Sequence, residues 1–146
     1  LKVTYDKDEE YPLYKLLGLE TEIAKLLNRK VWLKSGGFLI IEPTEAMVVI
    51  DVNSGKSIGK KQKEKHIFET NYEAAKEIVR QLRLRNLSGI IMIDFINMNS
   101  IEYKQKIIEC LKNGLHRDKI PGYFIEITKL DLFELTRKKI RKPIHD

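Results

Sequence analysis

Two short apolar runs, each ending in an aspartate, constrain the fold of this chain more than any other feature of its sequence. Residues 46–50 (AMVVI) lead into Asp51, and residues 90–93 (IIMI) lead into Asp94. Short runs rich in β-branched residues are typical of buried strands. A carboxylate at the tip of such a strand must be solvated, hydrogen-bonded or bound to a cation, because an unpaired charge is not stable in the core. Two such tips, joined by one helical crossover, predict a shared site at one edge of a sheet.

The elements around these two strands are predicted from turn signals and apolar periodicity. Further strands are expected at residues 31–33, 38–41 and 123–127, the first two as a hairpin. Helices are expected at residues 13–28, 67–84, 99–116 and 131–141, with a loop at 56–65. The helix at 99–116 should have Asn99 or Ser100 as its N-cap and should bury Ile101 and Leu111. The order β-β-β-α-β-α-β-α indicates an α/β fold, a mixed β-sheet with parallel crossover strands covered by helices.

The shared site would suit a divalent cation. If strands 46–51 and 89–94 are parallel, Asp51 and Asp94 lie at the same carboxyl end of the sheet, where two neighbouring carboxylates repel unless a cation lies between them. Magnesium fits, with manganese as the second choice, because it takes oxygen ligands and completes its shell with water and substrate phosphate. Asn53 follows Asp51 by two residues, so it points to the same face of an extended strand. A metal held there could activate water and neutralise charge on a scissile phosphate.

The same residues allow a second interpretation. The sequence DVNSG at residues 51–55 is also a good turn sequence, so the aspartates could cap loops without holding a metal. Other chemistry finds little support, since the glycines match neither standard phosphate-binding loop and the histidines are widely spaced. The lone Cys110 excludes a cysteine-based zinc site within these residues. Spacing alone leaves both interpretations open.

The charge balance of the chain favours a polyanionic partner. Its formal net charge is +6 at pH 7 and its sequence pI is about 9.3. A lysine cluster follows the first strand tip directly and consists of Lys56, Lys60, Lys61, Lys63 and Lys65. A solvated loop would account for the cluster alone, but its position beside the expected metal site favours contacts with nucleic acid.

The chain shows no sign of a membrane span or a secretion signal. No apolar stretch approaches the roughly 18 residues that a membrane span needs, and the N-terminal residues lack the apolar core of a signal peptide. With a single cysteine, these features lead us to expect a cytoplasmic location.

Several sequence blocks together resemble the ribonuclease E/G family. They are LKSGG at 33–37, TEA at 44–46, IDVNSG at 50–55, TNYEAA at 70–75, RQLRLR at 80–85 and IDFI at 93–96. They occur in the family's order over about residues 27–141, and the combination is specific although no single block is. One departure is Asn97, which stands where the family more often has an aspartate.

The resemblance implies a domain organisation and an activity. Residues 27–146 would be the deoxyribonuclease-I-like catalytic subdomain, and residues 1–26 the trailing segment of a ribonuclease-H-like subdomain. The implied activity is that of a magnesium-dependent endoribonuclease, a hydrolase that cleaves single-stranded RNA to 5′ phosphate and 3′ hydroxyl ends in RNA processing and decay. Asp51 and Asp94 would hold the metal and Asn53 would orient them.

The resemblance also implies partners. RNA backbone contacts are expected from the residues Lys56, Lys60, Lys61, Lys63, Arg80 and Arg83. The family's other domains, and a zinc link that joins its subunits, are not found within these residues. We therefore expect the other domains of a parent enzyme and a homo-oligomer as partners, and weak activity from this chain alone. The rival hypothesis is a non-catalytic basic module that binds nucleic acid or docks onto a partner.

Overall fold

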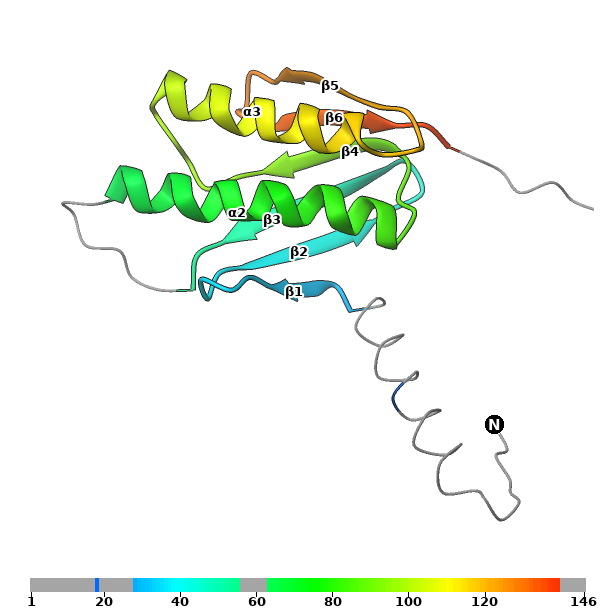
Figure 1. The fold of residues 1–146 in the computed structure, drawn as a ribbon, viewed down its shortest axis with the longest axis horizontal. Coiled ribbons are helices and arrows are strands. Elements are labelled where there is room, and N and C mark those ends of the chain that lie inside the picture. The colour runs from blue at the N-terminus through cyan, green and yellow to red at the C-terminus, as the bar shows by residue number, and fades with distance from the viewer. Residues whose placement is uncertain (1–17, 19–27, 56–62, 140–146) are drawn as a thin grey trace, which may run out of the picture.

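The computed structural model of the chain describes residues 18, 28–55 and 63–139. In this part of the chain, strands form a mixed sheet in the order β1-β2-β3-β4-β6-β5, and α2 and α3 cover one of its faces (Figure 1). The strands are β1 Lys30–Trp32, β2 Phe38–Pro43, β3 Met47–Asn53, β4 Gly89–Asp94, β5 Gly122–Ile127 and β6 Phe133–Arg137. The helices are α2 Lys63–Leu84 and α3 Ile101–His116. The predicted α/β class is therefore confirmed.

The central pair of strands has the predicted direction. β3 and β4 are parallel, with Met47 opposite Ile90 and Asp51 opposite Asp94. Helix α2 makes the connection between them and packs on the sheet (Figure 1). The hairpin of β1 and β2 pairs antiparallel, also as predicted, and β2 continues antiparallel onto β3.

The helix predicted at residues 131–141 is wrong, because β6 occupies this position. β6 pairs antiparallel with both β4 and β5 and lies between them. Phe133, Leu135 and Arg137 are buried and the residues between them are not. This alternation is typical of a strand, in which every second side chain points to the same face. β5 therefore runs in the direction of β4 without touching it, and β3–β4 is the one parallel pair among the described strands.

Some helix boundaries also differ from prediction. α2 begins at Lys63, so residues 63–65 are helical where a loop was expected. Ser100 is the N-cap of α3, and its Oγ accepts a hydrogen bond from Tyr103 N–H. Ile101 was expected to be buried but is 77% exposed at the first residue of the helix.

Several predictions fall outside the described residues. They concern the segment 1–26, the helix at 13–28 apart from Gly18 and Asn28, and the lysine segment 56–62. Gly18 is helical and exposed, and Asn28 lies just before β1.

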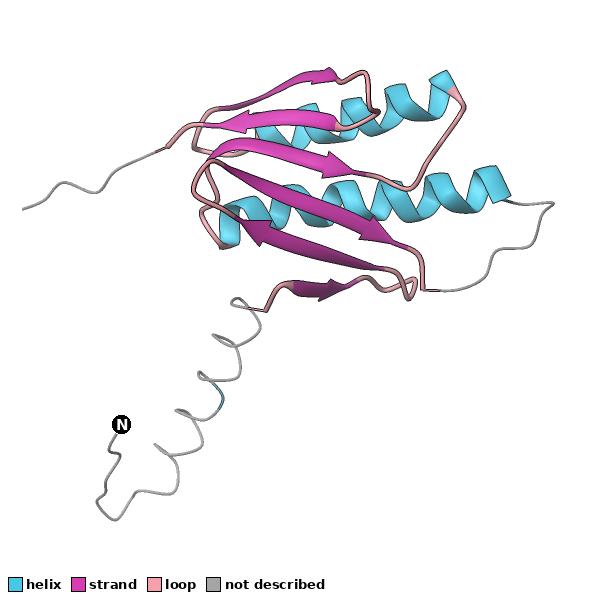
Figure 2. Ribbon diagram, turned by 180° about the vertical axis from the view of Figure 1, so that it is seen from behind, coloured by secondary structure: helices cyan, strands magenta, loops and turns pink. Residues whose placement is uncertain are grey.

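The hydrophobic core lies between the covered face of the sheet and the two helices. Its fully buried side chains are Leu39, Ile41, Ile50, Ile78, Leu82, Ile91, Ile93, Ile107, Leu111 and Leu135. Figure 2 shows the opposite face of the sheet, which no described helix covers. That open face carries exposed apolar side chains, among them Trp32, Val49, Ile90 and Tyr123.

Close packing of α2 against α3 depends on Gly114. A Cβ atom added to this buried glycine would lie 2.9 Å from Val79 Cβ and 2.5 Å from Val79 Cγ2. Gly114 thus lies inside α3 for a packing reason.

We expect Gly114→Ala to destabilise the chain by about 2 kcal/mol, because the added methyl group overpacks the interface between the helices. Val79→Ala should restore much of this loss in the double variant, since it removes the colliding methyl groups. Urea unfolding of the single and double variants measures both effects. Simple additivity of the two changes would contradict the expected contact.

Candidate functional site

Asp51 and Asp94 meet at the carboxyl end of the two parallel strands. They are Cα partners in the β3–β4 ladder, and neighbouring strands lie about 4.8 Å apart. Both residues are exposed. The pKa of Asp94 is raised above its ordinary value, first by partial loss of solvent around its carboxylate and then by the negative charge of Asp51. The structure therefore brings together the two carboxylates that the sequence predicted to share a site.

Asn53 completes this group. Its Nδ2 donates a hydrogen bond to Asp51 Oδ2 at 3.4 Å. The two side chains lie on the same face of β3, as predicted, because residues two apart on a strand point the same way. Asn53 is thus placed to orient the Asp51 carboxylate.

This group lies on the open face of the sheet. Val52 and Ile93 are buried against the helices, so Asp51, Asn53 and Asp94 project to the opposite side, which Figure 2 shows uncovered by described helices. Both α2 and α3 begin at this edge of the sheet (Figure 1). Helix N-termini carry partial positive charge and favour nearby anions such as phosphate. Negative charge is therefore favoured near this edge of the sheet.

Asn71 is a site residue that the sequence analysis did not single out. It is fully buried in α2, and its side chain makes two hydrogen bonds to the segment that follows Asp94. Asn71 Nδ2 donates to Ile96 O at 2.8 Å, and Ile96 N–H donates to Asn71 Oδ1 at 3.0 Å. A polar residue on the apolar face of an amphipathic helix was the available signal. Asn71 fixes the position of the chain just beyond the Asp94 carboxylate.

We expect Asn71→Leu to destabilise the chain by about 2 kcal/mol, because it leaves the N–H and C=O of Ile96 without partners. Leucine is similar in size, so the change removes the hydrogen bonds with little change in volume. Asn113→Leu, at an exposed position of α3, is the matched control and should change stability little. Chemical denaturation measures both variants, and equal stability of the two would contradict the assigned role.

The glycines of the hairpin turn pack closely against the same strand end. A Cβ atom on Gly37 would lie 2.7 Å from the backbone oxygen of Asn53. A Cβ atom on Gly55 would collide with the backbone oxygen of Gly36, which has a φ of 99°. The glycines therefore let the turn at 35–37 approach Asn53 and support its position.

The donor set fits magnesium better than a zinc site of the structural type. Among the described residues, no group of three or more His, Cys, Asp or Glu side chains could hold a metal ion. Magnesium needs only one or two protein carboxylates, because water and substrate phosphate supply its other ligands. A structural zinc site requires four protein ligands. The pair Asp51 and Asp94 is compatible with this ligand requirement.

The basic residues predicted to bind RNA are not gathered at one place. Lys63 begins α2 at the edge of the sheet where the carboxylates lie, whereas Lys56, Lys60 and Lys61 fall outside the described residues. Arg80 and Arg83 lie near the other end of α2, and Arg80 is about 25 Å along the helix from Lys63 at 1.5 Å per residue. The structure does not bring these two arginines together with Asp51 and Asp94.

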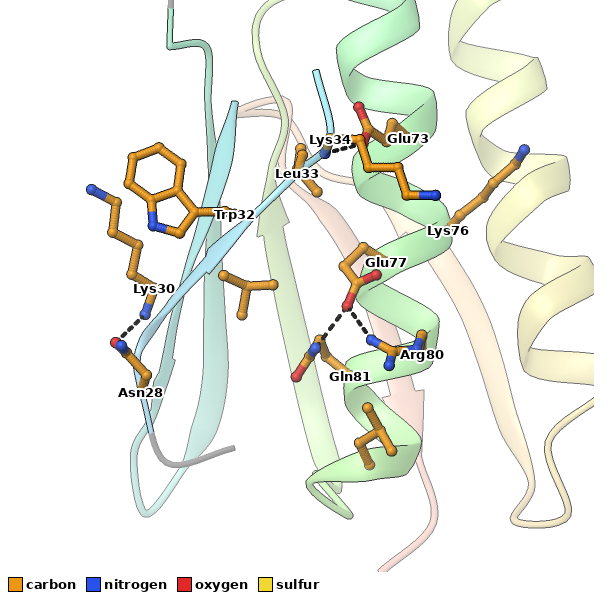
Figure 3. A pocket seen from close by; sticks show the side chains of 12 residues that line it. Asn28, Lys30, Trp32, Leu33, Lys34, Glu73, Lys76, Glu77, Arg80 and Gln81 are labelled. Atoms are coloured by element: carbon orange, nitrogen blue, oxygen red, sulfur yellow. Dashed lines mark hydrogen bonds and ion pairs between the residues drawn. The ribbon is translucent and has the colours of Figure 1, made fainter. Parts of the chain in front are cut away.

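Arg80 lies instead in a groove between β1 and α2 (Figure 3). The groove has a volume of about 690 Å³, and neither Asp51 nor Asp94 lines it. Glu77 Oε2 accepts hydrogen bonds from Arg80 Nη1 at 2.8 Å and from Gln81 Nε2 at 2.7 Å, so the charge of Arg80 is paired there.

No helix among the described residues is long and apolar enough to cross a membrane.

Comparison with known proteins identifies relatives of this chain. It is 45% identical to ribonuclease G of Escherichia coli over 133 residues, which are 91% of this chain and 27% of that protein. Ribonuclease G of Haemophilus influenzae is 44% identical over the same shares of both chains. Ribonuclease E of a Nostoc species is 40% identical over 146 residues, which are 100% of this chain and 21% of that protein.

The chain thus spans about a quarter of the length of these ribonuclease G relatives. The sequence profile of the ribonuclease E/G family matches residues 1–140, nearly the whole chain. This chain therefore belongs to the ribonuclease E/G family.

Proposed function

We propose that this chain forms the metal-binding core of an endoribonuclease that cleaves single-stranded RNA. The observation that carries the proposal is the register that pairs Asp51 with Asp94 at the carboxyl end of β3 and β4. The printed names of the relatives, ribonuclease G and ribonuclease E, support RNA as the substrate. Other regions of a parent enzyme would contribute to RNA binding, since the chain spans only 27% of the first of these relatives.

Each residue of the site has a chemical role in this proposal. Asp51 and Asp94 would hold magnesium, and Asn53 would keep the Asp51 carboxylate oriented through its hydrogen bond. The bound ion would supply Lewis-acid chemistry, polarising water and neutralising charge on the scissile phosphate. Hydrolysis of the P–O3′ bond would leave a 5′ phosphate and a 3′ hydroxyl. The N-terminus of α3, which begins at Ile101 after the short segment that follows Asp94, favours the negative charge of the phosphate.

The lysines would act through charge rather than through sequence recognition. Lys63 lies at the edge of the sheet that carries Asp51 and Asp94, and contacts with the phosphate backbone position RNA without reading its bases. We expect weak cleavage by the chain alone, because in-line attack needs the scissile phosphate held firmly over the metal. RNA processing and decay in the cytoplasm is the setting that we propose for the parent enzyme.

The test is cleavage of an end-labelled single-stranded RNA with and without magnesium, followed by analysis of the product ends. We expect slow, magnesium-dependent cleavage that leaves 5′ phosphates, and similar dependence when manganese replaces magnesium. Asp51→Asn should remove the cleavage while Asn113→Leu retains it. RNA that is bound but stays intact with either metal would instead favour a non-catalytic binding module.

A further inference from the structure

A small cavity of about 220 Å³ lies beside Asp94. Its lining comes from the segment that follows β4, the first turn of α3 and the turn between β5 and β6. Phe95, Met98 and Phe133 also line it, although only 6%, 3% and 2% of their surfaces are exposed. The rings of Phe95 and Phe133 contact each other edge to face, with centroids 4.8 Å apart. The cavity thus has a firmly packed base next to the proposed metal site, and the accessible part of its lining is mostly polar.

The rim of the cavity pairs a cation with an anion. Lys104 Nζ lies 3.4 Å from Asp131 Oδ1, and the Lys104 side chain is 24% exposed. Asp131 has a φ of 65°, in the left-handed region that aspartate and asparagine adopt more readily than most residues. Hydrogen bonds between Thr128 and Leu132 close the turn that holds it, with Leu132 N–H donating to Thr128 Oγ1 at 3.1 Å. The ammonium and the carboxylate are therefore presented side by side from two rigid elements.

The size and chemistry of the cavity suit a single nucleobase. Its volume is below the roughly 300–1,000 Å³ of pockets that hold drug-sized ligands. Proteins recognise bases of single-stranded RNA in part by hydrogen-bonding their edges, and the polar rim of this cavity offers such contacts. Guanine presents two N–H donors beside a carbonyl oxygen, which match a carboxylate next to an ammonium. Adenine and cytosine have a ring-nitrogen acceptor where guanine has N1–H, and uracil has a ring N–H but no amino group. None of the three gives the carboxylate two adjacent donors while it offers a carbonyl oxygen to the ammonium.

We propose that this cavity binds an unstacked guanine of the RNA, in a nucleotide next to the phosphate held at Asp51 and Asp94. Asp131 accepts hydrogen bonds from N1–H and N2–H of the guanine, and Lys104 donates to its O6. The inference rests on the proposed function, because it takes the RNA to lie across the site at Asp94. It assigns Lys104 and Asp131 as residues that determine base preference.

The experiment compares binding of labelled oligouridylates in which one position is guanosine, inosine, adenosine or uridine, by fluorescence anisotropy with the RNA checked on a gel. We expect the chain to bind the guanosine oligomer about tenfold more tightly than the uridine oligomer. Inosine should bind more weakly than guanosine, since it lacks the N2 amino group. This comparison needs no substitution, so it holds even if a variant fails to fold.

Variants then test which residues cause the preference for guanine. Asp131→Asn, which tolerates the left-handed backbone, and Lys104→Ala should each reduce the ratio towards one. Lys106→Ala, on the same helix but beside the Phe68 ring, is the matched control and should keep the ratio. Binding without guanine preference, or a preference that survives in both variants, overturns the inference alone. Failure of the chain to bind any of the oligomers overturns the proposed function as well.

Discussion

Replacing Asp94 with asparagine is expected to reduce RNA cleavage by at least about a hundredfold while the chain stays folded. Removing a residue that only hydrogen-bonds to a metal ligand already lowers metal affinity or activity about 10- to 100-fold. The loss of a direct carboxylate ligand should therefore lower the cleavage rate more. Asp51→Asn should have a similar effect, because both carboxylates face the same position. Asn53→Ala should lower the cleavage rate by only about 10- to 100-fold, since Asn53 acts by orienting Asp51.

The stability of the Asp94→Asn variant gives a second, opposite readout. Burial and the charge of Asp51 raise the pKa of Asp94, so the folded state disfavours the ionised carboxylate. For an acid whose folded pKa is raised, this unfavourable contribution is absent at low pH and sets in as the pH rises through the unfolded value, about 3.9. Without metal, the variant should therefore be at least as stable as the wild type near neutral pH, and the difference should vanish in acid.

Thermal unfolding with and without magnesium completes this prediction. The wild-type chain should gain stability from the metal by mass action, and the Asp94→Asn variant should gain less. A variant that gained as much from magnesium, or that kept its cleavage rate, would show that Asp94 does not hold the metal.

The strand tips were predictable because their geometry follows from local sequence. The apolar runs identify the strands, and a single crossover helix requires a parallel pair, which places Asp51 and Asp94 at one edge. The role of Asn71 was not predictable in the same way. Its partner, Ile96, is 25 residues away and is set by how α2 crosses the end of β4. No local pattern carries that information.

The error at β6 has a related cause. Residues 131–141 contain apolar side chains whose spacing suits a helix as well as a strand, and propensity alone does not decide between them. Antiparallel pairing with β4 on one side and β5 on the other selects the strand. The positions of Arg80 and Arg83 show the same limit, because sequence gives their charge but not the end of the sheet beside which they lie.

Arg137→Met is expected to destabilise the chain by about 3–5 kcal/mol, the second large effect. Arg137 and Asp118 form an ion pair with an Nε–Oδ2 distance of 2.8 Å, and their side chains are only 2% and 5% exposed. Arg137 Nη1 also donates to Asn86 Oδ1 and to Leu87 O. Its loss leaves the buried carboxylate of Asp118 without its hydrogen-bonded ion-pair partner, which costs far more than the pair itself contributes.

The double variant separates the cost of losing the ion pair from the cost of leaving one buried charge unpaired. Replacing both Arg137 with methionine and Asp118 with leucine removes the two charges together, so it should cost clearly less than Arg137→Met alone. Chemical denaturation of the two single variants and the double variant gives the coupling energy. Losses that simply add would contradict a coupled pair.

The pH dependence of this ion pair follows from the pKa of Asp118. Burial alone would raise that pKa, but hydrogen bonds from Arg137 and Ile120 N–H, with the charges of Arg137 and Arg83, outweigh it and lower the pKa. A lowered folded pKa means that the stabilisation is present above the unfolded value, about 3.9, and is lost as the pH falls through the folded value. The wild type and Asp118→Asn should therefore differ in unfolding free energy near neutral pH and converge in strong acid. A difference that stayed constant down to about pH 2 would mean that the Asp118 charge does not stabilise the fold.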